Sequence, residues 1–202
     1  SGDPKRQEAA GYAMASKVEP TRPEKIAIIG SGPAGIAAAA DLARKGYGVT
    51  VFEKEAEIGG LLRYGIGAHR LPREILDREL QFIQWLGVNF TPNHSIDLST
   101  SLPNLIKEYD GVVIATGTWH DRQLGIPGEQ LTGVEGCLAF LARRQWEDLH
   151  TFSGKVAVIG DGNSAFDLAR TLTRMGAEVS IVSWFGAEHI PAEPDEVREA
   201  VE

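Results

Sequence analysis

Residues 25–53 read K-I-A-I-I-G-S-G-P-A-G-I-A-A-A-A-D-L-A-R-K-G-Y-G-V-T-V-F-E, and this stretch decides the fold. Its apolar start, residues 25–30, is typical of a parallel strand that is buried on both faces. Pro33 suits the first turn of a helix, and the alanine-rich run 34–45 predicts the body of that helix. Residues 48–53 then predict a second strand. The stretch therefore predicts one βαβ unit.

The turn between the first strand and the helix carries a dinucleotide-binding pattern. Residues 30–35 (G-S-G-P-A-G) fit G-x-G-x-x-G in the strand–turn–helix context that the pattern requires. Gly30 permits a tight turn, Gly32 lets the backbone approach a pyrophosphate, and Gly35 lets the helix pack closely on the strand. The start of the helix then offers unpaired N–H groups and a partial positive charge to phosphates.

An acidic residue stands at the end of the second predicted strand. Glu53 lies 23 positions after Gly30, where a carboxylate can hydrogen-bond the ribose hydroxyls of adenosine. The same negative charge disfavours a 2′-phosphate. The alternative is a plain glycine turn followed by a solvated glutamate, but it does not account for strand, turn, helix, strand and acid in this order.

A second unit of the same kind lies near the end of the sequence. Residues 155–159 and 178–182 predict two strands, and a helix between them stops at Gly176. Residues 160–165 (G-D-G-N-S-A) fit G-x-G-x-x-A at the start of that helix. Two nucleotide-binding units in one chain are the main feature of its organisation.

The sequence predicts further elements around these units. After Pro72, apolar residues at helical spacing predict an amphipathic helix that ends at Gly87. Its apolar stripe comprises Ile75, Leu76, Leu80, Ile83 and Leu86. The remaining elements that we predict are strands at 88–91 and 111–117, the latter buried, and helices at 6–16 and 138–149.

The composition of the chain disfavours several classes of partner and of metal or redox site. A net charge of −8 disfavours nucleic acid and anionic membranes as partners. The single cysteine, Cys137, excludes a disulfide or a cysteine-ligated iron–sulfur cluster within this chain. We expect neither a membrane span nor a signal peptide, and therefore a cytoplasmic location. The five histidines lack metal-ligand spacing, so we predict no metal site.

Two segments after Glu53 carry a resemblance to a known family. Residues 52–66 (F-E-K-E-A-E-I-G-G-L-L-R-Y-G-I) and 69–79 (H-R-L-P-R-E-I-L-D-R-E) resemble the FAD-binding half of the glutamate synthase small subunit and of dihydropyrimidine dehydrogenase, which are two-dinucleotide-binding flavoproteins. The resemblance implies that Gly59, Gly60 and Leu61 lie along the FAD pyrophosphate and ribityl chain, and that Arg70 contacts FAD. It also implies that the A-T-G segment 115–117 passes close to FAD.

The same resemblance assigns NAD(P)H to the second fingerprint. Asn163 and Ser164 are expected to add polar contacts to the pyrophosphate, whereas the carboxylate of Asp161 must point away from it. Similar NADPH-dependent proteins carry a basic pair after the next strand, but this chain has Trp184 and Phe185 there. Three interpretations stay open: NADH with its adenine stacked on these rings, weak or no binding, or aromatic residues of a core or interface. We favour NADH.

The predicted fold class is α/β, with two Rossmann-like βαβ dinucleotide-binding domains, the second inserted in the first, in a chain that ends before the fold is completed. We divide the chain into a polar leader with a short helix and linker (1–24), the first part of the FAD-binding domain (25–124) and a partial NAD(P)-binding domain (125–202). The predicted cofactor-binding residues are Gly30, Ser31, Gly32, Pro33, Ala34, Gly35, Glu53, Lys54, Gly59, Gly60, Leu61, Arg70, Ile96, Ala115, Thr116, Gly117, Gly160, Gly162, Asn163, Ser164 and Ala165.

The predicted function is an FAD-dependent oxidoreductase module that passes electrons from NAD(P)H through flavin to iron–sulfur clusters on a partner subunit or on the rest of the parent chain. No side chain is expected to act as a catalytic acid or base. The alternative is a non-catalytic dinucleotide-binding fragment or scaffold subunit that completes its site with another chain. A single-dinucleotide flavin oxidase ranks last, because it does not predict the second fingerprint.

Overall fold

The computed structural model describes residues 17–147 and 149–201, and the helix predicted at 6–16 lies outside them. The chain forms two compact units. The first comprises residues up to 63 together with 68–118, and the second comprises 64–67 and the residues from 119 onward. We describe each unit by itself.

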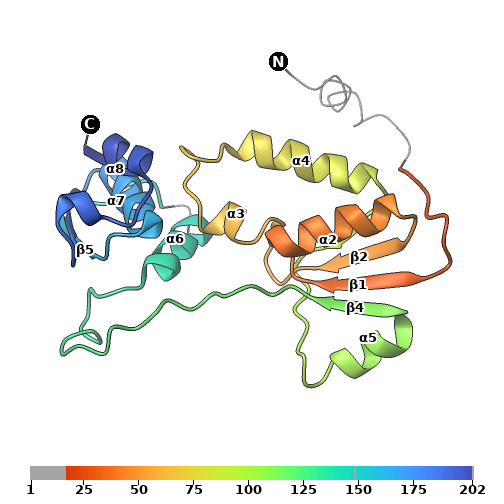
Figure 1. Ribbon diagram of the computed structural model, residues 1–202. Helices are drawn as coiled ribbons and strands as arrows, with labels where there is room; N and C mark the ends of the chain where they lie inside the picture. The colour runs from red at the N-terminus through yellow and green to blue at the C-terminus, as the bar shows by residue number, and fades with distance from the viewer. Residues whose placement is uncertain (1–16, 148, 202) are drawn as a thin grey trace, which may run out of the picture. The chain divides into compact units, whose positions relative to one another are not determined.

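A parallel sheet forms the centre of the first unit. Strand β1 (Lys25–Ile29) lies between β2 (Gly48–Phe52) and β4 (Gly111–Ile114) (Figure 1). Strand β3 (Asn89–Thr91) pairs with the other side of β2, which gives the order β3-β2-β1-β4. All three pairings are parallel, as the apolar runs predicted.

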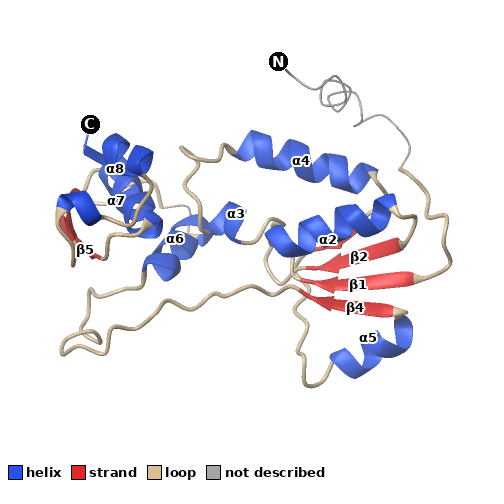
Figure 2. Ribbon diagram, viewed as in Figure 1, coloured by secondary structure: helices blue, strands red, loops and turns tan. Residues whose placement is uncertain are grey.

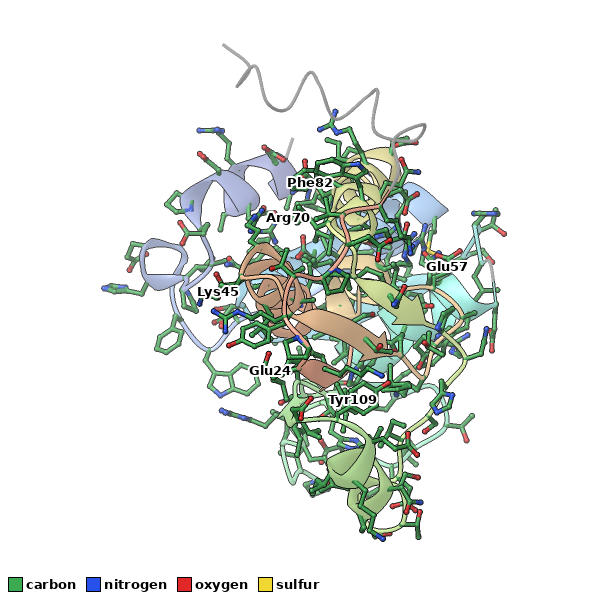
Figure 3. The ribbon with its side chains drawn as sticks, turned by 90° about the vertical axis from the view of Figure 1, so that its right-hand side faces the viewer. Glu24, Lys45, Glu57, Arg70, Phe82 and Tyr109 are labelled. Carbon is green, nitrogen blue, oxygen red and sulfur yellow. The ribbon has the colours of Figure 1, made fainter. Side chains whose placement is uncertain are left out.

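Helices cover both faces of this sheet. Helices α2 (Pro33–Arg44) and α4 (Arg73–Trp85) lie on one face and α5 (Leu102–Glu108) lies on the other (Figure 1). Successive residues of β1 therefore enter different clusters: Ile28 packs with α2, and Ala27 and Ile29 pack with α5. Figure 3 shows the same two sides, with Phe82 of α4 and Tyr109, the residue that follows α5, on opposite sides of the sheet.

Two expectations for the first unit were wrong in part. The strand predicted at 111–117 ends at Ile114, and it is not buried, because β4 is an edge strand and Ile114 keeps 54% of its surface exposed. Helix α4 buries Leu76, Leu80 and Ile83 as predicted, but Ile75 is 43% exposed. Adjacent helical residues point about 100° apart, so Ile75 and Leu76 cannot both face the sheet centrally.

The second unit repeats the βαβ arrangement on a smaller sheet. Strands β5 (Lys155–Ile159) and β6 (Glu178–Val182) pair in parallel and are joined by α7 (Asn163–Met175). Gly176 ends α7 in the left-handed conformation, with φ +105°, as the predicted stop requires. Phe140 and Leu141 complete its core from the preceding helix. The other elements of this unit are α6 (Cys137–Trp146), η2 (Ala187–His189) and α8 (Pro194–Val201). The short helix α3 (Leu61–Tyr64) lies mostly in the first unit.

The α/β class and both predicted βαβ units are thus confirmed. No helix or strand intervenes between β4 and α6 (Figure 2). Within the described residues, no helix combines the length and apolarity needed to cross a bilayer. The insertion of one domain in the other, and the bounds at 24 and 124, stay predictions.

Candidate functional site

The first candidate site lies where the strand order of the first unit reverses. The chain steps outward from β1 through β2 to β3 and then returns to β4 on the other side of β1. Ligands of such sheets bind outside the carboxyl ends of the strands at this point. Here Gly30 follows β1 and Ala115 follows β4. Gly30 adopts φ +101°, and a Cβ on it would lie 2.4 Å from the carbonyl oxygen of Ala115. Only glycine therefore fits this turn.

A buried junction of Ser31, Glu53 and Gly59 holds the glycine turn. The backbone N–H and the hydroxyl of Ser31 donate to Glu53 Oε2 at 2.9 and 2.6 Å. The N–H of Gly59 donates to Ser31 Oγ at 2.9 Å. Ser31 is fully buried and Glu53 is 4% exposed. Glu53 thus faces the turn, as predicted, and Ser31 ties the acid to the second glycine segment.

The start of α2 is open where a ligand would approach. Gly32 is the N-cap of α2, no side chain caps the helix, and Pro33 occupies its first turn. A Cβ built on Gly32 meets no atom within 4 Å, whereas one on Gly35 would lie 2.0 Å from the carbonyl oxygen of Gly30. The first N–H groups of the helix, including that of Ala34, have no intrahelical partner. Gly32 is therefore free for a ligand, and Gly35 is required for packing.

The Gly59–Gly60 pair packs directly on this turn. Gly59 and Gly60 adopt φ +127° and +53°, and a Cβ on Gly60 would lie 2.7 Å from the Cα of Gly32. Leu61 follows as the first residue of α3. The pair therefore covers the turn with backbone alone, which leaves the approach to Gly32 unobstructed by a side chain.

Our sequence reasoning missed Arg63, which organises the Gly59–Gly60 segment. The Arg63 side chain is 8% exposed and forms ion pairs with Glu57, at 3.0 Å, and with Asp77 of α4. Its Nε also donates to the carbonyl oxygen of Ile58 at 2.8 Å. The available signal was an arginine soon after the glycine pair, but its partner on α4 lies 14 positions away.

Of the other residues predicted for the first site, Ala115 lies at the glycine turn and the rest lie outside it. Ala115 donates its N–H to the carbonyl of Ile29 at 2.8 Å and so stays at the turn, and Thr116 and Gly117 follow as exposed residues. The remaining three lie elsewhere in the first unit: Lys54 is exposed and pairs with Glu55 at 3.3 Å, Ile96 packs on the core at the α5 face, and Arg70 is exposed on the segment before α4 (Figure 3).

The second glycine turn, after β5, is also open. A Cβ built on Gly160 or Gly162 meets no atom within 4 Å, and no side chain caps α7 at Gly162. Asn163 accepts the N–H of Glu193 at 2.8 Å through its Oδ1, so this oxygen holds the segment before α8. Ser164 is exposed and Ala165 is buried against the core.

A family model described as pyridine nucleotide-disulphide oxidoreductase matches residues 24–202. The chain belongs to this family. The match spans both glycine turns, which agrees with two βαβ units in the structure.

Known relatives confirm the resemblance stated from the sequence. The chain is 38% identical over 196 residues to the glutamate synthase [NADPH] small chain of Mycobacterium tuberculosis, covering 88% of this chain and 39% of the relative. It is 40% identical over 153 residues to an NAD-dependent dihydropyrimidine dehydrogenase subunit PreT homolog of Salmonella typhi, covering 75% and 37%. The chain spans between 26% and 40% of the length of the first curated relatives that it matches.

A solved structure supports the fold. Mycobacterium tuberculosis FprA in complex with NADPH superposes with a TM-score of 0.71 at 28% identity, covering 89% of this chain and 48% of FprA. The chain thus shares its fold with a protein that was solved with NADPH.

The one cysteine of this chain is a partly buried thiol. Cys137 packs against the core of the second unit, and its thiol donates to the carbonyl oxygen of Ser164 at 3.3 Å. Burial, reinforced by Asp121 and Asp167, raises the pKa of the Cys137 thiol to about 12. The thiol is therefore protonated at neutral pH and is a poor nucleophile.

The structure removes one interpretation of the aromatic pair after β6. Trp184 and Phe185 are 63% and 56% exposed, so neither is a core residue of this unit. The segment 181–186 (I-V-S-W-F-G) carries no lysine or arginine. Because both rings are exposed, three interpretations remain: adenine stacks on them, they form an interface, or they take no part in binding.

Proposed function

We propose that this chain is the dinucleotide-binding part of an FAD-dependent NAD(P)H oxidoreductase, with FAD in the first unit and the nicotinamide dinucleotide in the second. One observation carries the proposal: each unit has an open glycine turn at an uncapped helix start, beside the carboxyl ends of parallel strands. Such a turn binds a diphosphate through backbone N–H groups and the helix dipole.

The residues of the first unit fit the adenine half of FAD. In this proposal the N–H groups at the start of α2 hold the pyrophosphate above Gly32, and Glu53 holds the ribose. Glu53 Oε1 accepts the N–H of Glu55 at 2.9 Å, and Oε2 accepts Ser31 twice. A carboxylate offers about four lone-pair sites, so one stays free at Oε1 for a ribose hydroxyl.

The proposed reaction needs no acid or base from this chain. When bound, the flavin would take an electron pair from the reduced nicotinamide and pass electrons onward. The chain itself positions the two cofactors, holds their phosphates and keeps Glu53 oriented through Ser31. Cys137 takes no part, because burial holds its thiol protonated.

We propose NADH rather than NADPH for the second unit. The glutamate synthase relatives carry NADPH in their names and FprA was solved with NADPH, but segment 181–186 of this chain lacks any guanidinium or ammonium group to bind a 2′-phosphate. The dihydropyrimidine dehydrogenase relative is described as NAD-dependent. The exposed rings of Trp184 and Phe185 offer a surface on which adenine can stack.

We further propose that the electron acceptor is an iron–sulfur centre outside this chain. The relatives are described as a small chain and a subunit, which are parts of larger assemblies. A cluster needs several cysteine ligands, and this chain has one.

Spectroscopy of the intact protein tests the proposal. We expect a yellow protein with a flavin spectrum that NADH bleaches in the absence of oxygen, and bleaches at a lower concentration than NADPH does. A protein that neither nucleotide bleaches contradicts the proposed reaction. A colourless protein that takes up FAD only with a partner favours a scaffold subunit instead. Bleaching at lower NADPH than NADH contradicts only the choice of nucleotide.

A further inference from the structure

The two units contain the same contact with the acid and the hydroxyl exchanged. In the first unit, Ser31 is the middle residue of G-x-G and donates to Glu53, which directly follows β2. In the second unit, Asp161 is the middle residue of G-x-G and accepts from Ser183, which directly follows β6. Both hydrogen bonds measure 2.6 Å and both span 22 positions. The carboxylate thus lies in the glycine turn of the second unit instead of at the strand end.

We propose that Asp161 determines nucleotide specificity in the second unit: its carboxylate accepts a ribose hydroxyl of NADH and repels the 2′-phosphate of NADPH. The proposal rests on the function proposed above for that unit. In a βαβ unit the adenosine ribose lies between the glycine turn and the end of the second strand. The Asp161–Ser183 contact joins these two places, so a carboxylate held there faces the 2′ position.

The surroundings of Asp161 keep its charge available. Ser183 Oγ accepts the N–H of Phe185 at 2.9 Å, and its hydroxyl hydrogen has two acceptors within reach, Asp161 Oδ2 at 2.6 Å and the carbonyl oxygen of Phe185 at 3.0 Å, of which the carboxylate is the nearer. Within the described part of the chain, no lysine, arginine or histidine forms an ion pair with Asp161. The carboxylate is half-buried, so solvent screens it only in part. A neutral 2′-hydroxyl can donate to it, whereas a 2′-phosphate meets an uncompensated like charge.

The direction of the Asp161 side chain bears on what we expected from the sequence. We expected the Asp161 carboxylate to point away from the pyrophosphate, and in the structure it accepts a hydrogen bond from Ser183 at the end of β6. Its position there supports a role of its own. In this proposal, NADPH binds weakly for two reasons: the segment after β6 has no basic pair, and the Asp161 carboxylate repels the 2′-phosphate.

The experiment compares two probes that differ by one phosphate. We would titrate the intact protein with ADP-ribose and with 2′-phospho-ADP-ribose by calorimetry. The wild type is expected to prefer ADP-ribose. Asp161→Asn retains the shape of the side chain but removes its charge, so we expect the preference to fall by about tenfold or more, mainly through tighter binding of the phosphorylated probe.

Matched variants separate charge from structure. Asp195→Asn removes an exposed carboxylate from the same unit, where it pairs with Arg198, and should leave the preference unchanged. Asp161→Ser places a hydroxyl where the first unit has Ser31, and should lower the preference as Asp161→Asn does. Ser183→Ala keeps the charge of Asp161 but removes the hydroxyl that orients its carboxylate. It should weaken the binding of ADP-ribose and retain the preference for ADP-ribose over 2′-phospho-ADP-ribose. A flavin spectrum and a melting temperature like those of the wild type show that each variant is folded.

The outcomes distinguish this proposal from the one that it rests on. If folded Asp161→Asn and Asp161→Ser keep the full wild-type preference, Asp161 does not determine specificity, although binding of ADP-ribose still supports a dinucleotide site. If the wild type binds neither probe, the function proposed for the second unit is wrong and this inference is wrong with it.

Discussion

Single residues of the first glycine turn perform separate physical tasks. A Cβ on Gly35 would lie 2.0 Å from a backbone oxygen, whereas a Cβ on Gly32 would meet no protein atom within 4 Å. Gly35 is therefore needed by the fold, and Gly32 is needed only if a ligand lies above it. Packing and binding can thus be tested by one type of substitution at two positions.

Gly32→Ala and Gly35→Ala are expected to have different effects. Gly35→Ala should lower the free energy of unfolding by about 3 kcal/mol or more, because backbone has to move. Gly32→Ala should change the free energy of unfolding by less than about 1 kcal/mol, since φ is −70° there. It should nevertheless raise the Kd for FAD by about tenfold or more, because its methyl group occupies the place of the pyrophosphate. Urea unfolding and flavin titration measure these effects, and normal FAD binding by Gly32→Ala would contradict the proposed site.

Ser31 is expected to stabilise the first glycine turn. Ser31→Ala deprives Glu53 and the Gly59 N–H of a buried partner, so the free energy of unfolding should fall by about 1–3 kcal/mol. Ser99→Ala is the matched control, because the Ser99 hydroxyl bonds Asp97 at an exposed site. Ser99→Ala should lower the free energy of unfolding by less than about 1 kcal/mol. Equal effects in urea unfolding would contradict the structural role of Ser31.

At the scale of elements, α8 is attached to α7 by a buried ion pair. Arg170 of α7 has a side chain that is 8% exposed, and it pairs with Glu196 at 2.7 Å and with Glu199 of α8. The Glu196 side chain is itself 13% exposed. Removing one partner of a buried pair leaves an uncompensated charge, which is costly. The second unit therefore depends on Arg170 to keep α8 in place.

Arg170→Met is expected to release α8. The free energy of unfolding should fall by about 3 kcal/mol, because the change removes the mostly buried guanidinium group that pairs with Glu196 and Glu199. Arg198→Ala is the control on the same helix, where the paired side chains are 64% and 78% exposed, and it should cost less than about 1 kcal/mol. Amide hydrogen exchange should show faster exchange in α8 with Arg170→Met only. Unchanged exchange in α8 would contradict this attachment.

At the scale of the whole molecule, each unit has its own strands, core and glycine turn. The residues that hold the first turn all belong to the first unit, and those that hold the second turn all belong to the second unit. The two proposed binding sites should therefore be separable by mutation.

Gly162→Ala should impair only the second site. A Cβ there meets no atom within 4 Å, so the fold should tolerate it. We expect the Kd for ADP-ribose to rise by about tenfold or more while the FAD content stays at the wild-type level. Gly32→Ala should show the opposite pattern. Loss of both ligands in either variant would contradict separate sites, as measured by calorimetry and by the flavin spectrum of the same sample.

Local patterns in the sequence determined the βαβ units and the position of both glycine turns. An apolar run, a turn without side chains and a helix start are properties of neighbouring residues, so 25–53 and 155–182 could be interpreted without any knowledge of distant contacts. Glu53 was also predictable, because the end of the second strand has a set place in this unit.

Only the tertiary structure decided which side chains meet across these elements. Ser31 joins Glu53 and Gly59, Arg63 reaches Asp77, and Asp161 pairs with Ser183, over separations of 14 to 28 positions. Many serines, arginines and acids in the sequence could form such pairs, and only the folded backbone brings particular ones within hydrogen-bond distance. The exposure of β4 has the same origin, because an edge strand and a central strand can share one apolar sequence and differ only in their neighbours.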